Sequence, residues 1–250
     1  MSAELSNNSL INKKVIFEAN AFRRVPIHLG AKIDFLPDGT LLLTSGDGFD
    51  YKQQAQSLNN HFGKIIRLNK DGSVPSDNPF VDIPNALPEI FSYGHRNMQG
   101  LVVMEDGRIF EHEHGPRGGD EFNLIEPGKN YGWPAITYGI DYSGAVISPF
   151  TKMDGMEQPL KYWVPSIAPS DMIYYDGDLY PELTNSFLIT ALKSRDVKKI
   201  KKTNVLFSEE SIFSDLKSRL RSIGISPSGE IYLLTDGRKG NLLKVTFTEK

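Results

Sequence analysis

The chain has 250 residues, 39% of them hydrophobic, and its 28 basic and 31 acidic residues give a formal net charge of −3. The charges are interspersed, so no basic face of the kind that binds nucleic acid is predicted. No segment approaches the ~20 apolar residues of a membrane span, and residues 1–8 are polar where a signal peptide has its apolar core. The absence of cysteine excludes disulfide bonds and thiol chemistry but leaves the redox compartment open.

A strand, a tight turn and a second strand recur along the chain. The turns contain the pairs Asp38-Gly39, Asp71-Gly72, Asp106-Gly107 and Ser228-Gly229. Glycine supplies the positive φ that tight turns need, and β-branched or aromatic residues flank each pair. Such hairpins, with almost no helical periodicity between them, predict an all-β propeller of four-stranded antiparallel blades. A β-sandwich is the alternative, but its strands usually follow one another every ~8–12 residues without long polar excursions.

Two long excursions interrupt the hairpins, at residues 48–62 and 115–163. The second contains NYGWPAITYGIDYSG, which is too aromatic for a solvated linker, so we expect it to be ordered over one mouth of the fold. Elsewhere in the chain, a short helix is predicted over residues 209–217. The polar segment 198–204 is interpreted as a solvated strand end or turn.

Histidine and glutamate alternate at the start of the run EHEHGPRGGDE, residues 111–121. In a strand, His112 and His114 would share one face and Glu111 and Glu113 the other, because successive side chains point to opposite sides. Two histidines alone make an incomplete zinc site. Polar residues at the rim of a blade are therefore the favoured interpretation.

Calcium is better supported in the same run. Gly115 and Pro116 offer backbone carbonyl oxygens in an irregular turn, and Asp120 and Glu121 offer carboxylate oxygens nearby. A solvated acidic turn is the alternative interpretation.

The run RLR places Arg219 and Arg221 two residues apart. In a strand both guanidinium groups would point the same way and could clamp an anion with several carboxylates, although paired arginines more often face solvent. His28 and Lys193 stand alone, and spacing by itself assigns neither of them a catalytic role.

Five ordered runs, YGHRNMQG, EHGPRGGDE, NYGWP, ALKSRD and RLRSI, resemble the aldose sugar dehydrogenase branch of the glucose/sorbosone dehydrogenase family. The resemblance extends from about Ile27 to Lys244. It implies a six-bladed β-propeller with pyrroloquinoline quinone (PQQ) on its top face, calcium beneath the quinone, and a histidine base that starts sugar oxidation. Residues 1–250 are then expected to form a single propeller domain, the C-terminal part of the family's propeller.

The segment HLGAK resembles the family's His-x-Gly-Gly-Arg stretch, which implies that His28 is the general base. Neutral imidazole would take the proton of the C1 hydroxyl while hydride leaves C1 for the quinone. The residues that the resemblance assigns to cofactor binding are Arg96, Asn97, Tyr142, Lys193, Arg219 and Arg221. The first two would stabilise charge on the quinone oxygens, and the lysine and the RLR arginines would contact its carboxylates. Trp163 is a further candidate to line the pocket.

The resemblance also implies two calcium sites built from oxygen ligands. The carbonyl groups of Gly115 and Pro116 match those that hold the catalytic calcium, which acts as a Lewis acid on the quinone. Glu121 and Tyr131 match a second, structural calcium site.

Several positions depart from the family pattern. Ala31 and Lys32 stand where glycine and arginine are usual, Ile27 stands where one branch has an acid, and Gly48 stands where a polar side chain often meets the cofactor. Replacing arginine by lysine removes a planar hydrogen-bonding fork, so weaker quinone binding is expected.

Family members carry roughly a hundred further residues before this point, including a signal peptide and the first blades. About four blades on their own leave strand edges exposed and the cofactor surface open on one side. We therefore expect weak or absent sugar oxidation by these 250 residues alone, and the exposed edges favour association between copies of the chain.

The favoured function is that of a quinoprotein dehydrogenase that oxidises an aldose at C1 to its lactone and passes the electrons to an external acceptor. The resemblance places such an enzyme in the periplasm or outside the cell. Two alternatives are a non-catalytic propeller that binds a sugar or a partner, and a calcium-dependent propeller lactonase, which would not need the cationic set.

Overall fold

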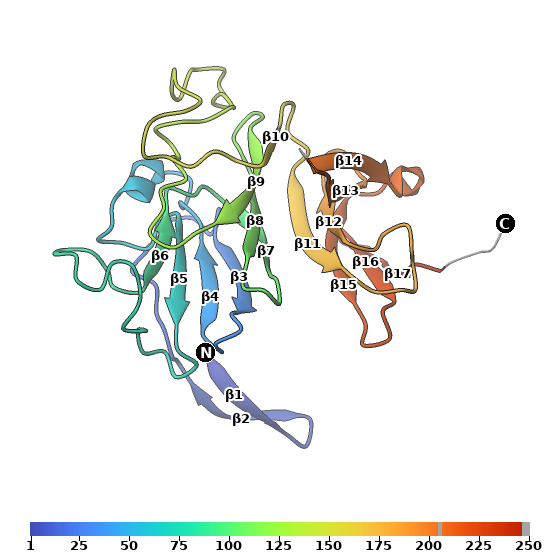
Figure 1. Cartoon of the computed structure of the whole chain (residues 1–250), viewed down its shortest axis with the longest axis horizontal. Coiled ribbons are helices and arrows are strands. Elements are labelled where there is room, and N and C mark those ends of the chain that lie inside the picture. The colour runs from blue at the N-terminus through green and yellow to red at the C-terminus, as the bar shows by residue number, and fades with distance from the viewer. Residues whose placement is uncertain (205–206, 247–250) are drawn as a thin grey trace.

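The structure is a computed structural model of the chain, and it describes residues 1–204 and 207–246. The strands form separate sheets that stand one after another, as Figure 1 shows. Within the described residues, three sheets have four antiparallel strands, one has three, and a further hairpin stands apart. The predicted all-β architecture of propeller blades is confirmed.

Blade 1 consists of β3 (Gly30–Phe35), β4 (Leu41–Ser45), β5 (Lys64–Leu68) and β6 (Ile90–Tyr93). Blade 2 consists of β7 (Met98–Val103), β8 (Ile109–Glu113), β9 (Asp120–Ile125) and β10 (Lys161–Trp163). Blade 3 consists of β11 (Pro169–Tyr175), β12 (Ser186–Ala191), β13 (Val197–Lys202) and β14 (Phe207–Ile212). Blade 4 consists of β15 (Leu220–Ile225), β16 (Ile231–Thr235) and β17 (Leu242–Lys244). The separate hairpin is β1 (Ser2–Ser6) and β2 (Ser9–Lys14), and the two 3-10 turns are η1 (Lys52–Gln56) and η2 (Ser214–Leu216).

The glycines of the four predicted turns all have positive φ: Gly39, Gly72, Gly107 and Gly229. In the first turn, Asp38 Oδ1 accepts the backbone N–H of Thr40 at 2.8 Å, which fixes the aspartate before the glycine. The turn at residues 71–72 differs from the expected hairpin, because β6 begins only at Ile90 after a long connection.

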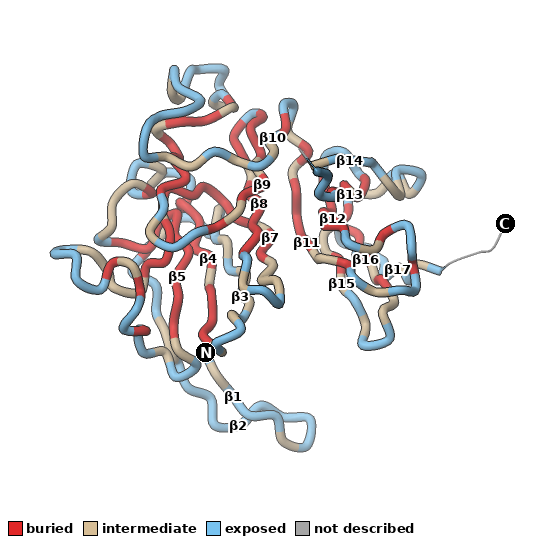
Figure 2. The backbone as a smooth tube through the Cα atoms, in the orientation of Figure 1, coloured by how far each residue is buried: buried red, intermediate tan, exposed pale blue. Residues whose placement is uncertain are grey.

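The apolar core lies between successive blades rather than within one central mass. Phe122 of blade 2 and Phe187 of blade 3 pack edge to face with ring centroids 5.2 Å apart, and both are buried. Further apolar clusters join blade 1 to blade 2 and blade 3 to blade 4. Figure 2 shows the resulting pattern, with buried backbone along the sheets and an exposed β1–β2 hairpin.

Polar contacts join the innermost strands, which are the first of each blade and pack in the order β3, β7, β11, β15. Asp171 on β11 binds Lys32 Nζ from β3 at 2.5 Å through one carboxylate oxygen. Its other oxygen accepts the Ser222 hydroxyl and the backbone N–H of Ile223 on β15. Lys32 is therefore held by a carboxylate of another blade.

Two local predictions need correction, and a third holds. Residues 209–217 contain no helix of the predicted kind: β14 runs through residue 212, and only a 3-10 turn follows. Strand pairing prevails there because Lys199 on β13 lies opposite Glu210 and binds it at 2.5 Å. The segment 115–163 was expected to be a long loop, but it includes strands β9 and β10. The segment 198–204 contains the end of strand β13, as predicted. Within the described residues, no helix has the length and apolar character to cross a membrane.

An apolar groove of about 760 Å³ runs along the side of blade 1 that faces away from blade 2. Ile33 and Phe35 on β3 line it and are 60% and 52% exposed. Leu41, Leu43 and Leu68 line it from β4 and β5. This groove leaves an apolar sheet face in contact with solvent.

Ala31 has a φ of 75°, in the left-handed region that favours glycine, at a position where the resembling family carries glycine. We expect Ala31→Gly to raise the free energy of unfolding by about 0.5–1 kcal/mol, because relief of the Cβ strain exceeds the added chain entropy. Urea unfolding measures the change. Ala145→Gly, at an exposed alanine without positive φ, is the control and should lower stability instead.

Candidate functional site

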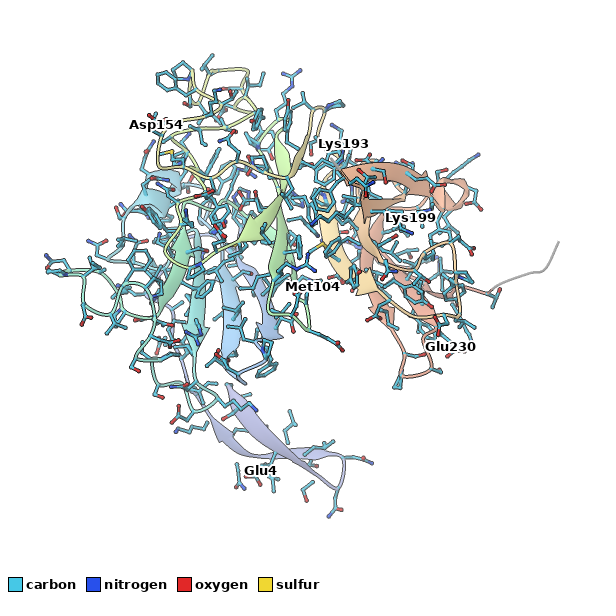
Figure 3. The ribbon with its side chains drawn as sticks, viewed as in Figure 1. Glu4, Met104, Asp154, Lys193, Lys199 and Glu230 are labelled. Atoms are coloured by element: carbon cyan, nitrogen blue, oxygen red, sulfur yellow. The ribbon has the colours of Figure 1, made fainter. Side chains whose placement is uncertain are left out.

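The predicted site residues lie in loops at one end of the blades. The innermost strands β3, β11 and β15 run in the same direction in Figure 1, and each second strand returns antiparallel to the first. The segments before each first strand and after each second strand therefore meet at the upper end of the figure. Figure 3 shows Lys193 and Asp154 toward this end and Glu230 toward the other.

A cavity of about 270 Å³ opens at this end, between blades 1 and 2 and the long connection that follows β9. The side chains that line it are His28, Asp47, Phe49, Asp50, Lys52, Arg96, Pro116, Trp133, Asp141, Tyr142 and Ile147. Of the predicted site residues, the structure thus brings together the proposed base, one arginine, the tyrosine and one predicted calcium ligand.

His28 is held by a buried carboxylate. Its Nδ1 lies 2.7 Å from Asp47 Oδ1, and the Asp47 side chain is 1% exposed. Asp47 Oδ2 accepts the indole N–H of Trp133 at 2.8 Å, and Oδ1 also accepts the backbone N–H of Phe49. With Nδ1 occupied, Nε2 is the histidine nitrogen that remains for a ligand in the cavity.

Arg96 brings a buried positive charge to the same cavity. It is 3% exposed, and its Nη1 donates to His114 O and Gly115 O at 2.8 and 2.7 Å. Its guanidinium carbon lies 5.2 Å from the Trp133 ring, and its Nε has no hydrogen-bond partner. Within the described residues Arg96 forms no ion pair with a carboxylate, which makes it suited to an anionic ligand.

Gly115 and Pro116 form the predicted turn, but the donors around it differ from expectation. Gly115 O accepts the Arg96 guanidinium, as described above. The Asp120 carboxylate accepts the Gly115 N–H, the Ser166 hydroxyl and the backbone N–H groups of Ile167 and Ala168. Asp120 therefore shapes the loop and is not free to bind calcium.

The remaining predicted cofactor residues lie at the same end but do not line the cavity. Asn97 accepts a hydrogen bond from Gln99 at 3.0 Å, and Lys193 is exposed after β12. Arg219 and Arg221 both bind Asp236, at 2.9 and 3.0 Å. Their guanidinium groups hold the pKa of that carboxyl below its usual value. The RLR arginines are therefore paired with an acid that the sequence analysis did not consider.

Aromatic rings form the open wall of the cavity. Tyr142 is 58% exposed and its ring lies parallel to that of Phe49, with centroids 6.4 Å apart. The Phe49 ring in turn meets His28 edge on at 5.1 Å. The candidate Trp163 does not belong here: it is buried in the core between blades 2 and 3, and its indole N–H binds Glu209.

The second predicted calcium site, Glu121 and Tyr131, lies behind the cavity on blade 2. The Tyr131 hydroxyl donates to Leu124 O and accepts the N–H of Glu126, so only its backbone oxygen remains for a cation. Burial raises the pKa of the Glu121 carboxyl well above its usual value, and repulsion from Glu113 adds to this. A cation near Glu121 would relieve that repulsion.

The sequence analysis missed Asp47 and Trp133. Asp47 follows Gly46 in the run SGD, and a Cβ at Gly46 would lie 2.2 Å from His28 O, so glycine permits the close approach of the two segments. Trp133 stands in the quoted run NYGWP. Both signals were present in the sequence, but pairing residues 28, 47 and 133 requires the fold.

The family profile described as Glucose / Sorbosone dehydrogenase matches residues 1–244. The chain belongs to this family. It is 39% identical to the aldose sugar dehydrogenase YliI of Escherichia coli over 243 residues, which cover 93% of the chain and 65% of that relative. The chain spans about 62–65% of the length of the first curated relatives it matches.

Solved structures of sugar dehydrogenases are also similar to this chain. A crystal structure of a glucose dehydrogenase is 42% identical and superposes with a TM-score of 0.94, covering 98% of this chain and 72% of that one. The PQQ-bound aldose sugar dehydrogenase of Streptomyces coelicolor is 26% identical with a TM-score of 0.73, covering 96% of this chain and 68% of that one.

We expect Asp47→Asn to lower the free energy of unfolding by about 1–3 kcal/mol, because a buried acceptor of three hydrogen bonds loses its charge and one acceptor atom. Urea unfolding followed by tryptophan fluorescence measures the loss. Asp50→Asn is the matched control: this exposed aspartate lines the same cavity, so a change within ±0.5 kcal/mol is expected. Equal effects of the two substitutions would contradict the structural role of Asp47.

Proposed function

We propose that this chain carries the catalytic face of a PQQ-dependent aldose dehydrogenase, which oxidises its sugar at C1 to the lactone. The observation that carries the proposal is His28, fixed by buried Asp47 in the cavity that Arg96 also lines, in a member of the glucose/sorbosone dehydrogenase family. The PQQ-bound Streptomyces relative supports the identity of the cofactor.

His28 acts as the general base. Asp47 holds the imidazole by Nδ1, so that Nε2 takes the proton of the C1 hydroxyl when a sugar enters the cavity. As the proton leaves, the C1–O bond gains double-bond character and the C1 hydrogen departs with its electron pair. The Asp47 carboxylate then stabilises the imidazolium that forms.

Arg96 is the residue of this cavity best suited to hold the cofactor. Its guanidinium binds two backbone carbonyl oxygens and lies over an aromatic ring, and its Nε has no partner, so an anionic ligand would complete its hydrogen bonding. Bound PQQ would supply the acceptor for the hydride from C1. We propose four further cofactor ligands at the same end of the blades: Asn97, Lys193, Arg219 and Arg221. The two arginines already bind Asp236, so a cofactor carboxylate would share them with that acid.

Calcium fits the Gly115–Pro116 turn poorly in this arrangement. The guanidinium of Arg96 occupies Gly115 O at 2.7 Å, and a divalent cation on that oxygen would face the same positive charge. The proposed proton transfer to His28 therefore does not involve calcium at this turn.

The wider setting follows the family. We propose an aldose as substrate, an external electron acceptor that reoxidises the cofactor, and a periplasmic or secreted location. The parallel rings of Phe49 and Tyr142 at the open side of the cavity provide an apolar surface of the kind that sugars stack on.

We expect His28→Asn to lower PQQ-dependent dye reduction with an aldose by ~10²–10⁴-fold, because the base is lost. Quinone binding, measured by absorbance titration, should be unchanged. Lactone hydrolysis without quinone would instead support a lactonase, and lack of quinone binding would support a binding module; either result would overturn the proposal.

We expect Arg96→Met to weaken PQQ binding by ~10–100-fold, because one charged hydrogen-bonding partner is lost. The same absorbance titration measures the dissociation constant. Arg108→Met is the control, since Arg108 is half-exposed, pairs with Asp106 and lies in the turn between β7 and β8 at the opposite end of the blade. Equal affinities of the two variants would show that the cofactor does not contact Arg96.

A further inference from the structure

Blade 2 carries a buried acidic cluster on the face of β8 opposite to His112 and His114. Glu111 and Glu113 alternate on β8, and Asn123 on β9 lies across from Glu111 in the strand register. His95, in the turn before β7, closes the cluster. Ligand atoms of His95, Glu111 and Glu113 lie within 4.8 Å of one another, and all three residues are buried.

Too few hydrogen-bond donors reach the oxygen atoms of this cluster. Asn123 Nδ2 donates to Glu111 Oε2 at 3.2 Å, and the Arg96 backbone N–H donates to Glu113 Oε2 at 2.8 Å. Glu111 Oε1 and Asn123 Oδ1 have no partner, although Glu111 is 0% and Asn123 1% exposed. Two buried oxygen acceptors without donors are costly unless a positive group reaches them.

The imidazole of His95 adds a third acceptor. Its Nε2 contacts Ser92 Oγ at 2.9 Å, and its Nδ1 lies 3.6 Å from Glu113 Oε2 without a hydrogen bond. When Nε2 donates to Ser92, the lone pair of Nδ1 faces the carboxylate. Two lone pairs at this separation match neighbouring ligands of one ion, since metal–ligand distances of ~2.0–2.4 Å place adjacent ligand atoms about 3 Å or more apart.

The charges of the two glutamates also favour a bound cation. Burial raises the pKa of Glu113 to about 8 and raises the pKa of Glu111 well above its usual value. Lys64, whose charge acts on His95, does not compensate, because its Nζ binds the carbonyl oxygens of Gln54, Ala55 and Phe62. One divalent cation would neutralise both glutamates at once.

We infer that His95, Glu111 and Glu113 bind a divalent cation, with Asn123 Oδ1 as a fourth ligand. The donor set combines one imidazole nitrogen with carboxylate and amide oxygens, which suits Mn²⁺ or Zn²⁺ better than Ca²⁺. The ion would stabilise the turn that presents Arg96, because Glu113 accepts the Arg96 N–H and His95 is its neighbour.

This site is distinct from the expected calcium pair Glu121 and Tyr131, although it adjoins it. Asn123 Nδ2 lies 3.5 Å from Glu121 Oε2, so the amide separates Glu121 from Glu111. Tyr131 contributes only the face of its ring, which stacks on His95 with centroids 4.6 Å apart. The two sites therefore predict different responses to substitution of the two glutamates.

The test is isothermal titration of chelator-treated protein with Mn²⁺, Zn²⁺ and Ca²⁺ separately, together with thermal unfolding of each sample. We expect one Mn²⁺ or Zn²⁺ per chain and a rise in Tm on binding. Glu111→Gln should weaken binding at least ~10–100-fold. The control Glu105→Gln, at an exposed glutamate in the turn between β7 and β8, should bind within ~2-fold of the wild type.

Stability of the metal-free proteins separates a ligand from a merely structural residue. Without metal, Glu111→Gln should melt at a higher temperature than the wild type, because a buried carboxyl group with an unpartnered oxygen is replaced by a neutral amide that can donate hydrogen bonds. The inference is overturned if the wild type binds neither Mn²⁺ nor Zn²⁺, if Glu111→Gln binds as the wild type does, or if binding is restricted to Ca²⁺ and is lost only in Glu121→Gln.

Discussion

The direction of the innermost strands is the constraint on which the site depends. Because these strands run the same way and each second strand returns antiparallel, loops far apart in sequence meet at one end of the blades. His28 before β3, Asp47 after β4 and Arg96 before β7 reach one cavity for this reason. The chemistry of the site is thus a product of topology, since no two of these residues are adjacent in the sequence.

Local signals predicted the blades well. Asp-Gly turns and alternating apolar residues depend on only a few neighbouring positions of the sequence. The turn glycines have the positive φ that was expected of them. The segment 209–217 was predicted wrongly because its pairing partner is another strand. Residues 207–212 pair with residues 197–202 along the whole strand, and this pairing outweighs local helical preference.

The site was predictable only in part, for a physical reason. Family motifs pointed to His28, Arg96 and Tyr142, which do line the cavity. They could not show that Arg219 and Arg221 share the single carboxylate of Asp236, or that Asp171 draws Lys32 to another blade. Charge in a motif is a property of one residue, whereas the field at a site depends on every neighbour that folding brings near.

The apolar groove on blade 1 favours one kind of covering neighbour over another. Burial of the part of Ile33 and Phe35 that is still exposed would contribute ~1–2 kcal/mol each. That gain is smaller than or similar to the ~4–15 kcal/mol of motional freedom that two separate molecules lose when they associate. A sheet tethered to the same polypeptide avoids most of that loss, because its effective concentration is already high. The exposed face is thus better suited to a covalently linked neighbour than to a freely diffusing copy.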